Sequence, residues 1–172
     1  FPESRVDFTF GEGDKFKLGK VTLTALHTPG HCAGHSCFYW ESAGILFSTD
    51  IDLAYSGPWY GSKSADLDDF IASIKRIREL KPRVLIPGHG RIITENQEQR
   101  FAKYLNCLYE REAALRELLR EPQTLEELAK HHIIYEDHAN PLFRYWEKIM
   151  VLKHLERLEQ SGQIKQQEGH YF

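Results

Sequence analysis

The sequence predicts an α/β fold: a sheet within the first 95 residues, followed by a smaller and mostly helical region. Two observations predict the sheet. Short apolar segments rich in β-branched residues end on polar residues, and an amphipathic helical pattern separates the last two of them. A third observation predicts the helical region, because after Ile93 the pattern changes to long charged stretches with apolar residues at helical spacing.

Five segments have strand character, and they are residues 5–10, 20–27, 36–40, 44–49 and 83–87. The first is predicted from its alternation of polar and apolar residues. Residues 11–19 contain three glycines and read as a turn. The segments 44–49 and 83–87 are almost wholly apolar, so we expect both to be buried on both faces of the sheet.

One helix is predicted between the last two strands, over residues 66–80, where apolar residues recur every three to four positions. Acidic residues fill its first turn and basic residues lie toward its end, which complements the helix dipole. Pro82 stops it. The strands on either side deliver Asp50 and His89 to the same end of the sheet, where α/β sheets place their chemistry.

The chain is predicted to have three parts. Residues 1–95 hold the sheet, residues 96–120 form a long connecting helix, and residues 121–172 form a small terminal domain. Capping-box patterns, in which Ser or Thr precedes Glu or Gln by three positions, predict a helix start at Thr94 and another at Thr124.

The order of elements in the terminal domain is typical of a winged helix. Its last helix is predicted to begin at Asn140-Pro141, an N-cap followed by a first-turn proline, and to end before Gly162. A small hairpin is predicted to turn at Glu168-Gly169. Three helices followed by a hairpin give the winged-helix-like arrangement.

Composition argues against several classes of function. The net charge of −3 gives no sign of a polyanion-binding protein, and residues 121–172 carry six Lys or Arg against nine Asp or Glu, so nucleic-acid binding is disfavoured. No run of about 18 apolar residues predicts a membrane span. Cys32, Cys37 and Cys107 form neither a disulfide framework nor a zinc-type pair, which favours reduced thiols and a cytoplasmic location.

Three short motifs carry the candidate chemistry: HTPGH at 27–31, STD at 48–50 and PGHG at 87–90. In this order and with these strands, they resemble the later half of the metallo-β-lactamase superfamily. The tail is similar to the winged-helix extension of one branch, which includes endoribonuclease-like and acyl-thioester-hydrolase-like members. The resemblance implies the second half of an αββα sandwich, followed by a small, mostly helical winged-helix-like domain.

The resemblance also implies a site for two metal ions, usually zinc, with iron or manganese as alternatives. His31 would bind the first ion, His89 the second, and Asp50 would bridge them and could orient the nucleophile. Imidazoles and a carboxylate suit zinc, at about 2.0–2.1 Å. The family's H-x-H-x-D-H motif is absent from this sequence. We therefore expect a missing N-terminal half of the same domain as a partner.

Four further residues are candidates for the substrate pocket. His35 either lines the pocket or is a hydrogen-bonded structural histidine. Tyr55, Trp59 and Tyr60 belong to an aromatic loop, which either shapes a pocket or packs on the tail helix. Thr49 stands where the family usually has a glycine before the bridging aspartate.

The activity implied by the resemblance is metal-dependent hydrolysis, in which a metal-bound hydroxide attacks an ester, thioester or lactone bond of a small molecule. The activity is expected to need the upstream half. Alternatives on the same fold are an endoribonuclease or phosphodiesterase and a mononuclear iron oxygenase. A non-catalytic winged-helix interaction module is the alternative of another class. Because one sheet face would meet water without the upstream half, self-association, including a homodimer, is also expected.

Overall fold

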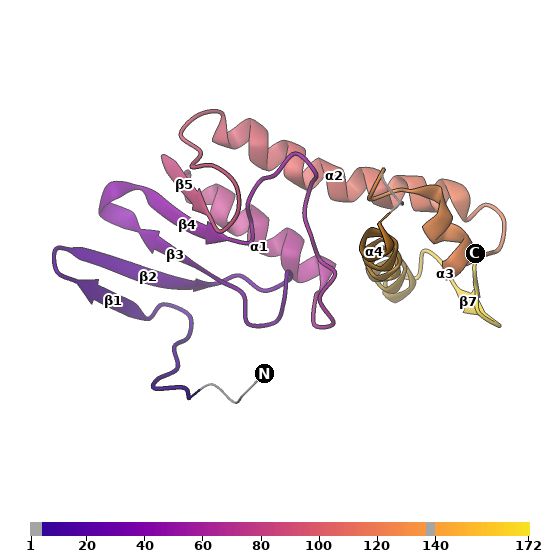
Figure 1. The fold of residues 1–172 in the computed structure, drawn as a ribbon, viewed down its shortest axis with the longest axis horizontal. Coiled ribbons are helices and arrows are strands. Elements are labelled where there is room, and N and C mark those ends of the chain that lie inside the picture. The colour runs from indigo at the N-terminus through magenta and orange to yellow at the C-terminus, as the bar shows by residue number, and fades with distance from the viewer. Residues whose placement is uncertain (1–4, 137–139) are drawn as a thin grey trace.

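The computed structural model describes residues 5–136 and 140–172. The sheet lies at one end of an elongated molecule and the small terminal elements at the other, with helix α2 (Gln97–Leu118) extending over both (Figure 1). Within the described residues, no helix is long and apolar enough to cross a membrane.

A five-stranded mixed sheet, in the order β1-β2-β3-β4-β5, forms the first region. Its strands are β1 (Lys15–Leu18), β2 (Val21–His27), β3 (Ser36–Trp40), β4 (Ile45–Thr49) and β5 (Val84–Pro87), and a short 3₁₀ helix η1 (Glu41–Ala43) joins β3 to β4. The first four strands pair antiparallel, whereas β4 and β5 are parallel. The crossover between β4 and β5 contains α1 (Leu67–Glu79), so both strands end at the same edge of the sheet.

The predictions for the start of the chain are wrong. Residues 5–10, all of which the structure describes, form no strand, and β1 lies inside the segment predicted as a turn. The apolar residues of the first segment make aromatic contacts instead. The ring centroid of Phe10 lies 5.5 Å from that of Phe16 and 5.6 Å from that of Phe38. Phe10 thus packs on the sheet without strand pairing, whereas Val6 and Phe8 are 70% and 71% exposed.

Helix α1 confirms its prediction to within one residue at each end. Asp66 is the N-cap, and Phe70, Ile74 and Ile77 are fully buried. Gly30 allows the first turn of the helix to come close, because its φ is +123° and a Cβ there would lie only 2.2 Å from the Cα of Phe70. Helix α1 therefore rests directly on the turn that precedes the first candidate ligand.

The expectation that β4 and β5 are buried on both faces is wrong. Leu46 and Leu85 are fully buried in a core that they share with α1 and α2. Their neighbours Ile45, Phe47 and Ile86 are only partly buried. The reason is that the two helices cover one face of the sheet, and the apolar character of a strand does not reveal how many faces are covered.

Helix α2 takes part in two apolar clusters. Residues from Phe101 to Leu108 join the core beneath the sheet, whereas Leu115 and Leu119 join a second cluster formed by the terminal elements. Those elements are β6 (Gln123–Thr124), α3 (Leu125–Leu128), η2 (Ala129–His131), α4 (Pro141–Gln160), β7 (Gln166–Gln167) and β8 (His170–Tyr171). The three short strands pair in the order β6-β8-β7. The division into three parts and the winged-helix assignment stay predictions.

The local signals in the second half have mixed outcomes. Thr124 forms the complete capping box. Asn140 caps α4, because its Oδ1 accepts a hydrogen bond from the backbone amide of Leu142 at 2.9 Å. The box predicted at Thr94 is wrong, because α2 begins after Asn96, whose side chain makes no capping hydrogen bond. Helix α2 begins at Gln97, one residue inside the predicted range 96–120, and without the predicted capping box.

Candidate metal centre

The three predicted ligands meet at the edge of the sheet where β4 and β5 end. Oδ2 of Asp50 lies 3.7 Å from Nε2 of His31, and Oδ1 lies 3.4 Å from Nε2 of His89. Each carboxylate oxygen of Asp50 therefore faces a different imidazole. The His31 side chain is largely buried, whereas that of His89 is 76% exposed.

The backbone around Asp50 explains how the carboxylate reaches this position. The register of β4 against β5 shifts between Phe47 and Thr49, and Thr49 has a φ of +47°. The amide of Gly88 donates to the carbonyl oxygen of Thr49 at 2.7 Å, which ties the ends of the two strands together. A residue in this left-handed region is ordinarily glycine, so the threonine is held in a strained conformation.

His35 supports Asp50 from within the protein. It is 5% exposed, and its Nδ1 donates to the carbonyl oxygen of Thr28 at 2.7 Å. Its Nε2 is therefore an acceptor, and it lies 3.2 Å from the amide nitrogen of Asp50 and 2.7 Å from Oγ1 of Thr49. Burial lowers the pKa of His35, which favours this neutral form. The structure places His35 beneath the carboxylate, as a hydrogen-bonded structural histidine would be placed.

His31 has its own fixed partner. Its Nδ1 lies 3.0 Å from the carbonyl oxygen of Trp59. A carbonyl can only accept, so Nδ1 carries the proton and the lone pair of Nε2 faces Asp50 in the neutral ring. The ring of Trp59 also packs on that of His31, with centroids 5.1 Å apart. This arrangement is the usual outer-shell support of a metal-binding imidazole.

The aromatic loop divides between the two roles that the sequence leaves open. Tyr55 is 82% exposed and lines an open pocket of about 600 Å³ together with His89. Trp59 packs edge-on against Trp146 of α4, with ring centroids 5.8 Å apart. Tyr60 is fully buried, and its hydroxyl lies 2.7 Å from Nε2 of His154 of α4. The structure thus puts Tyr55 beside the pocket and the other two aromatic rings against the tail.

Two buried residues that the sequence reasoning missed, Arg111 of α2 and His154 of α4, hold this loop. A signal for the first was present. Leu108 and Leu115 mark the apolar side of α2, and helical spacing places Arg111 and Glu112 on that same side. Charged residues on the apolar side of a helix indicate a buried polar network.

The donor set fits part of a zinc site. Two donors on one tetrahedral zinc, each about 2.0–2.1 Å from the ion, lie about 3.3 Å apart, and the His89–Asp50 and His31–Asp50 separations are 3.4 and 3.7 Å. Within residues 5–136 and 140–172, however, no group of three or more His, Cys, Asp or Glu side chains could hold a metal ion. The three predicted ligands would supply two donors to each of two ions, whereas catalytic zinc usually has three.

Comparison with known proteins gives the family. The profile of the Metallo-beta-lactamase superfamily matches residues 1–89. An atrochrysone carboxyl ACP thioesterase from Aspergillus fumigatus is 30% identical over 118 residues, which are 66% of this chain and 36% of that protein. The thioesterase pkgB from Emericella nidulans is 36% identical over 107 residues, or 62% of this chain and 30% of that protein. The chain spans about a third of the length of these relatives.

A solved structure matches nearly the whole chain. The crystal structure of a metallo-beta-lactamase family protein from Thermus thermophilus aligns with a TM-score of 0.83 and 28% identity, over 98% of this chain and 55% of that one. The alignment therefore includes the terminal elements as well as the sheet. With a matching profile over half of its residues and the mixed sheet in place, this chain belongs to the metallo-β-lactamase superfamily.

Proposed function

We propose that this chain is part of a metal-dependent hydrolase that cleaves ester or thioester bonds of small molecules. The observation that carries the proposal is the Asp50 carboxylate held between the His31 and His89 imidazoles at the ends of two parallel strands. The thioesterases among its relatives support the substrate class.

His31, His89 and Asp50 would hold the metal ions, and zinc suits their nitrogen and oxygen donors. Bound metal ions supply Lewis acidity and lower the pKa of water toward neutrality. The protein contributes orientation. His35 fixes the amide of Asp50, and the Trp59 carbonyl fixes the ring of His31. Asp50, with its side chain 36% exposed, can also accept a hydrogen bond from the nucleophile and so orient it.

The remaining donors, we propose, come from an upstream half of the same domain. Each ion would find two donors in this chain, which is one fewer than catalytic zinc usually has. The partly exposed face of the sheet, which carries Phe16, Phe38 and Phe47, is the surface on which such a half would pack. Without that half, we expect the chain to bind metal weakly and to self-associate.

The order helix, strand, two helices and hairpin, from α2 to β8, supports the proposal that residues 121–172 form a winged-helix-like unit together with the end of α2. Its acidic balance opposes phosphate contacts. One observation favours the phosphodiesterase alternative: Arg91 and Arg100 line the pocket beside His89, where they could bind an anionic group. An anionic carrier attached to a thioester would use the same contacts, so hydrolysis of both substrate types should be measured.

Replacement of each ligand tests the proposal. In the longer protein that carries the upstream half, His31→Ala, Asp50→Ala and His89→Ala should each lower metal content, measured by plasma mass spectrometry. Each should also slow thioester hydrolysis by more than about 100-fold, because loss of a ligand should exceed the 10- to 100-fold cost of outer-shell changes.

His27→Ala is the matched control, because this neighbouring histidine is exposed and its ring lies 2.8 Å from the Ala33 carbonyl oxygen instead of facing Asp50. It should retain metal and activity. Full metal content and normal turnover in all three ligand variants would refute the proposed site.

A further inference from the structure

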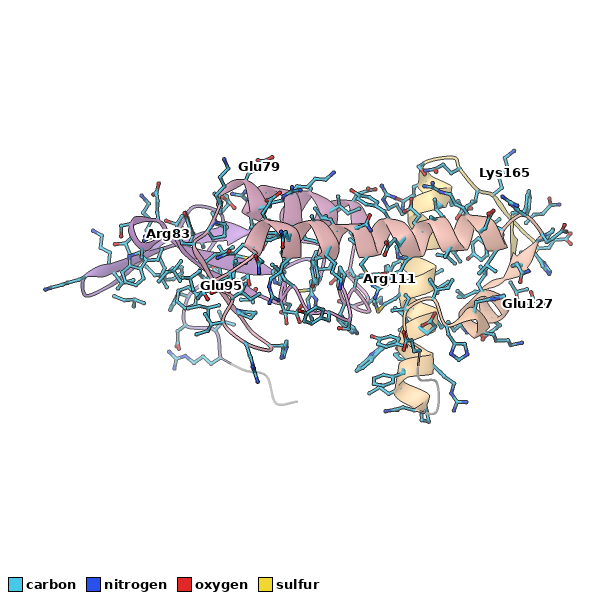
Figure 2. The ribbon with its side chains drawn as sticks, turned by 90° about the horizontal axis from the view of Figure 1, so that it is seen from above. Glu79, Arg83, Glu95, Arg111, Glu127 and Lys165 are labelled. Carbon is cyan, nitrogen blue, oxygen red and sulfur yellow. The ribbon has the colours of Figure 1, made fainter. Side chains whose placement is uncertain are left out.

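Arg111 lies on α2 near the point where this helix crosses α4 (Figure 2). Its side chain is buried and contacts the loop that follows Asp50. Its Nη2 donates to the carbonyl oxygen of Ser56 at 2.8 Å, and its Nη1 donates to that of Pro58 at 3.0 Å. Arginine suits this position because its planar group carries five donors in a fixed arrangement, so one side chain can hold several backbone carbonyls.

A second helix holds the same loop through Tyr60. Arg111 Nη1 donates to the Tyr60 hydroxyl at 3.2 Å, and the hydroxyl in turn lies 2.7 Å from Nε2 of His154. Glu112, whose Oε2 is 3.9 Å from Nδ1 of His154, is ion-paired with Arg157. Burial favours a neutral His154, so its Nε2 can accept the proton of the Tyr60 hydroxyl.

At Gly57 the loop lies directly against α2. Gly57 has a φ of +81°, and a Cβ at this position would lie 2.4 Å from Sγ of Cys107 and 3.1 Å from Nη2 of Arg111. At this point the loop therefore cannot shift toward α2.

Trp59 lies between Pro58, whose carbonyl oxygen accepts from Arg111, and Tyr60, whose hydroxyl contacts His154. The carbonyl oxygen of Trp59 itself accepts a hydrogen bond from Nδ1 of His31. We infer that α2 and α4 set the orientation and the tautomer of His31 through this loop, with Arg111 of α2 as the positioning residue and Tyr60 and His154 as its support. The inference rests on the proposed function only in treating His31 as a metal ligand.

The tautomer is measurable on this chain without metal. At about pH 9, two-bond ¹H–¹⁵N correlation spectra should show His31 with its proton on Nδ1, as its contact with the Trp59 carbonyl oxygen requires. In Arg111→Met, the Trp59 carbonyl is released, and we expect signals of the Nε2–H form of His31 to appear. A merely structural role of Arg111 would lower the melting temperature without changing this spectrum.

Arg157→Met is the matched control. It also removes an arginine that ties α4 to the rest of the protein, through Glu112 and through Asp68 at 2.7 Å, but no described contact of Arg157 reaches the loop at 56–60. This control should leave the His31 spectrum unchanged. Arg111→Lys, which keeps the charge, decides the matter if Arg111→Met does not fold, and it should give a mixture of the two tautomers.

A second readout uses Zn²⁺ and Co²⁺ with the longer protein. Arg111→Met should weaken Zn²⁺ binding by about 10- to 100-fold in chelator competition, which is the usual cost of losing outer-shell support, and should change the Co²⁺ absorption bands. If the parent protein binds metal but both Arg111 variants keep its tautomer and affinity, the inference alone is overturned. If His31→Ala binds metal as the parent does, the proposed function fails and the inference fails with it.

Discussion

Thr49 offers a direct test of how the site is built, because its backbone conformation and its side chain act in opposite directions. Its φ of +47° is unfavourable for a residue with a Cβ. Its Oγ1, however, can donate its one proton either to the carbonyl oxygen of Ser36, 3.0 Å away, or to Nε2 of His35, 2.7 Å away. This hydrogen bond offsets a strain that glycine would not have.

The variants Thr49→Ala and Thr49→Gly separate the two effects. Both lose the hydroxyl and its hydrogen bond, at a cost of about 0.5–1.5 kcal/mol. Only glycine relieves the left-handed strain of about 1–2 kcal/mol. Glycine also raises the conformational entropy of the unfolded chain, which lowers the free energy of unfolding by about 0.5–1 kcal/mol. We therefore expect Thr49→Gly to be more stable than Thr49→Ala by about 0.5–1 kcal/mol, or about 1–4 °C in melting temperature for a domain of this size.

Urea and thermal unfolding of the two variants measure this difference. The same pair of changes at Thr22, an exposed residue of β2 whose φ is not positive, is the control, and there alanine should be the more stable. The reasoning is refuted if alanine is at least as stable as glycine at position 49. Thr49→Ser should stay within about 0.5 kcal/mol of the parent, because it keeps the hydroxyl.

Three further outcomes are expected. Burial lowers the pKa of His154, so below about pH 6.5 the unfolded chain binds a proton that the folded chain does not. The free energy of unfolding should therefore decrease as the pH is lowered. Between pH 8 and pH 5, the urea midpoint should fall less steeply in His154→Gln than in the parent. Gly30→Ala should cost roughly 2–5 kcal/mol of unfolding free energy, because its Cβ meets the backbone of Phe70 at a φ of +123°; an unchanged melting curve would contradict this contact. Deletion of residues 121–172 should uncover Tyr60 and Arg111 and so change the oligomeric state measured by light scattering. It should not change the affinity for RNA or DNA, and a salt-dependent loss of that affinity would revive the endoribonuclease alternative.

The sequence predicts best those features that depend on neighbours along the chain. The periodicity and end signals of residues 66–80 predict α1 to within one residue. The turn at Glu168-Gly169 is confirmed by positive φ values at both residues. Strand β1 is missed because its lysines and apolar residues lie between glycines, which dominate the local pattern.

The support of the site depends on contacts that no local pattern contains. His31 meets the Trp59 carbonyl across 28 residues, and Tyr60 meets His154 across 94. Which face of β4 is covered is likewise decided by α1 and α2, not by the strand itself. The sequence therefore identifies the ligands as candidates, whereas their supporting residues become visible only once the chain is folded.

Helix α2 also determines how the molecule should unfold. Its 22 residues, about 33 Å of helix, belong at one end to the core beneath the sheet and at the other to the cluster of the terminal elements. Neither cluster can lose its share of α2 without fraying the helix that the other needs. The two ends should therefore unfold in one cooperative transition, and amide hydrogens from Phe101 to Leu115 should exchange with solvent at a single, global rate.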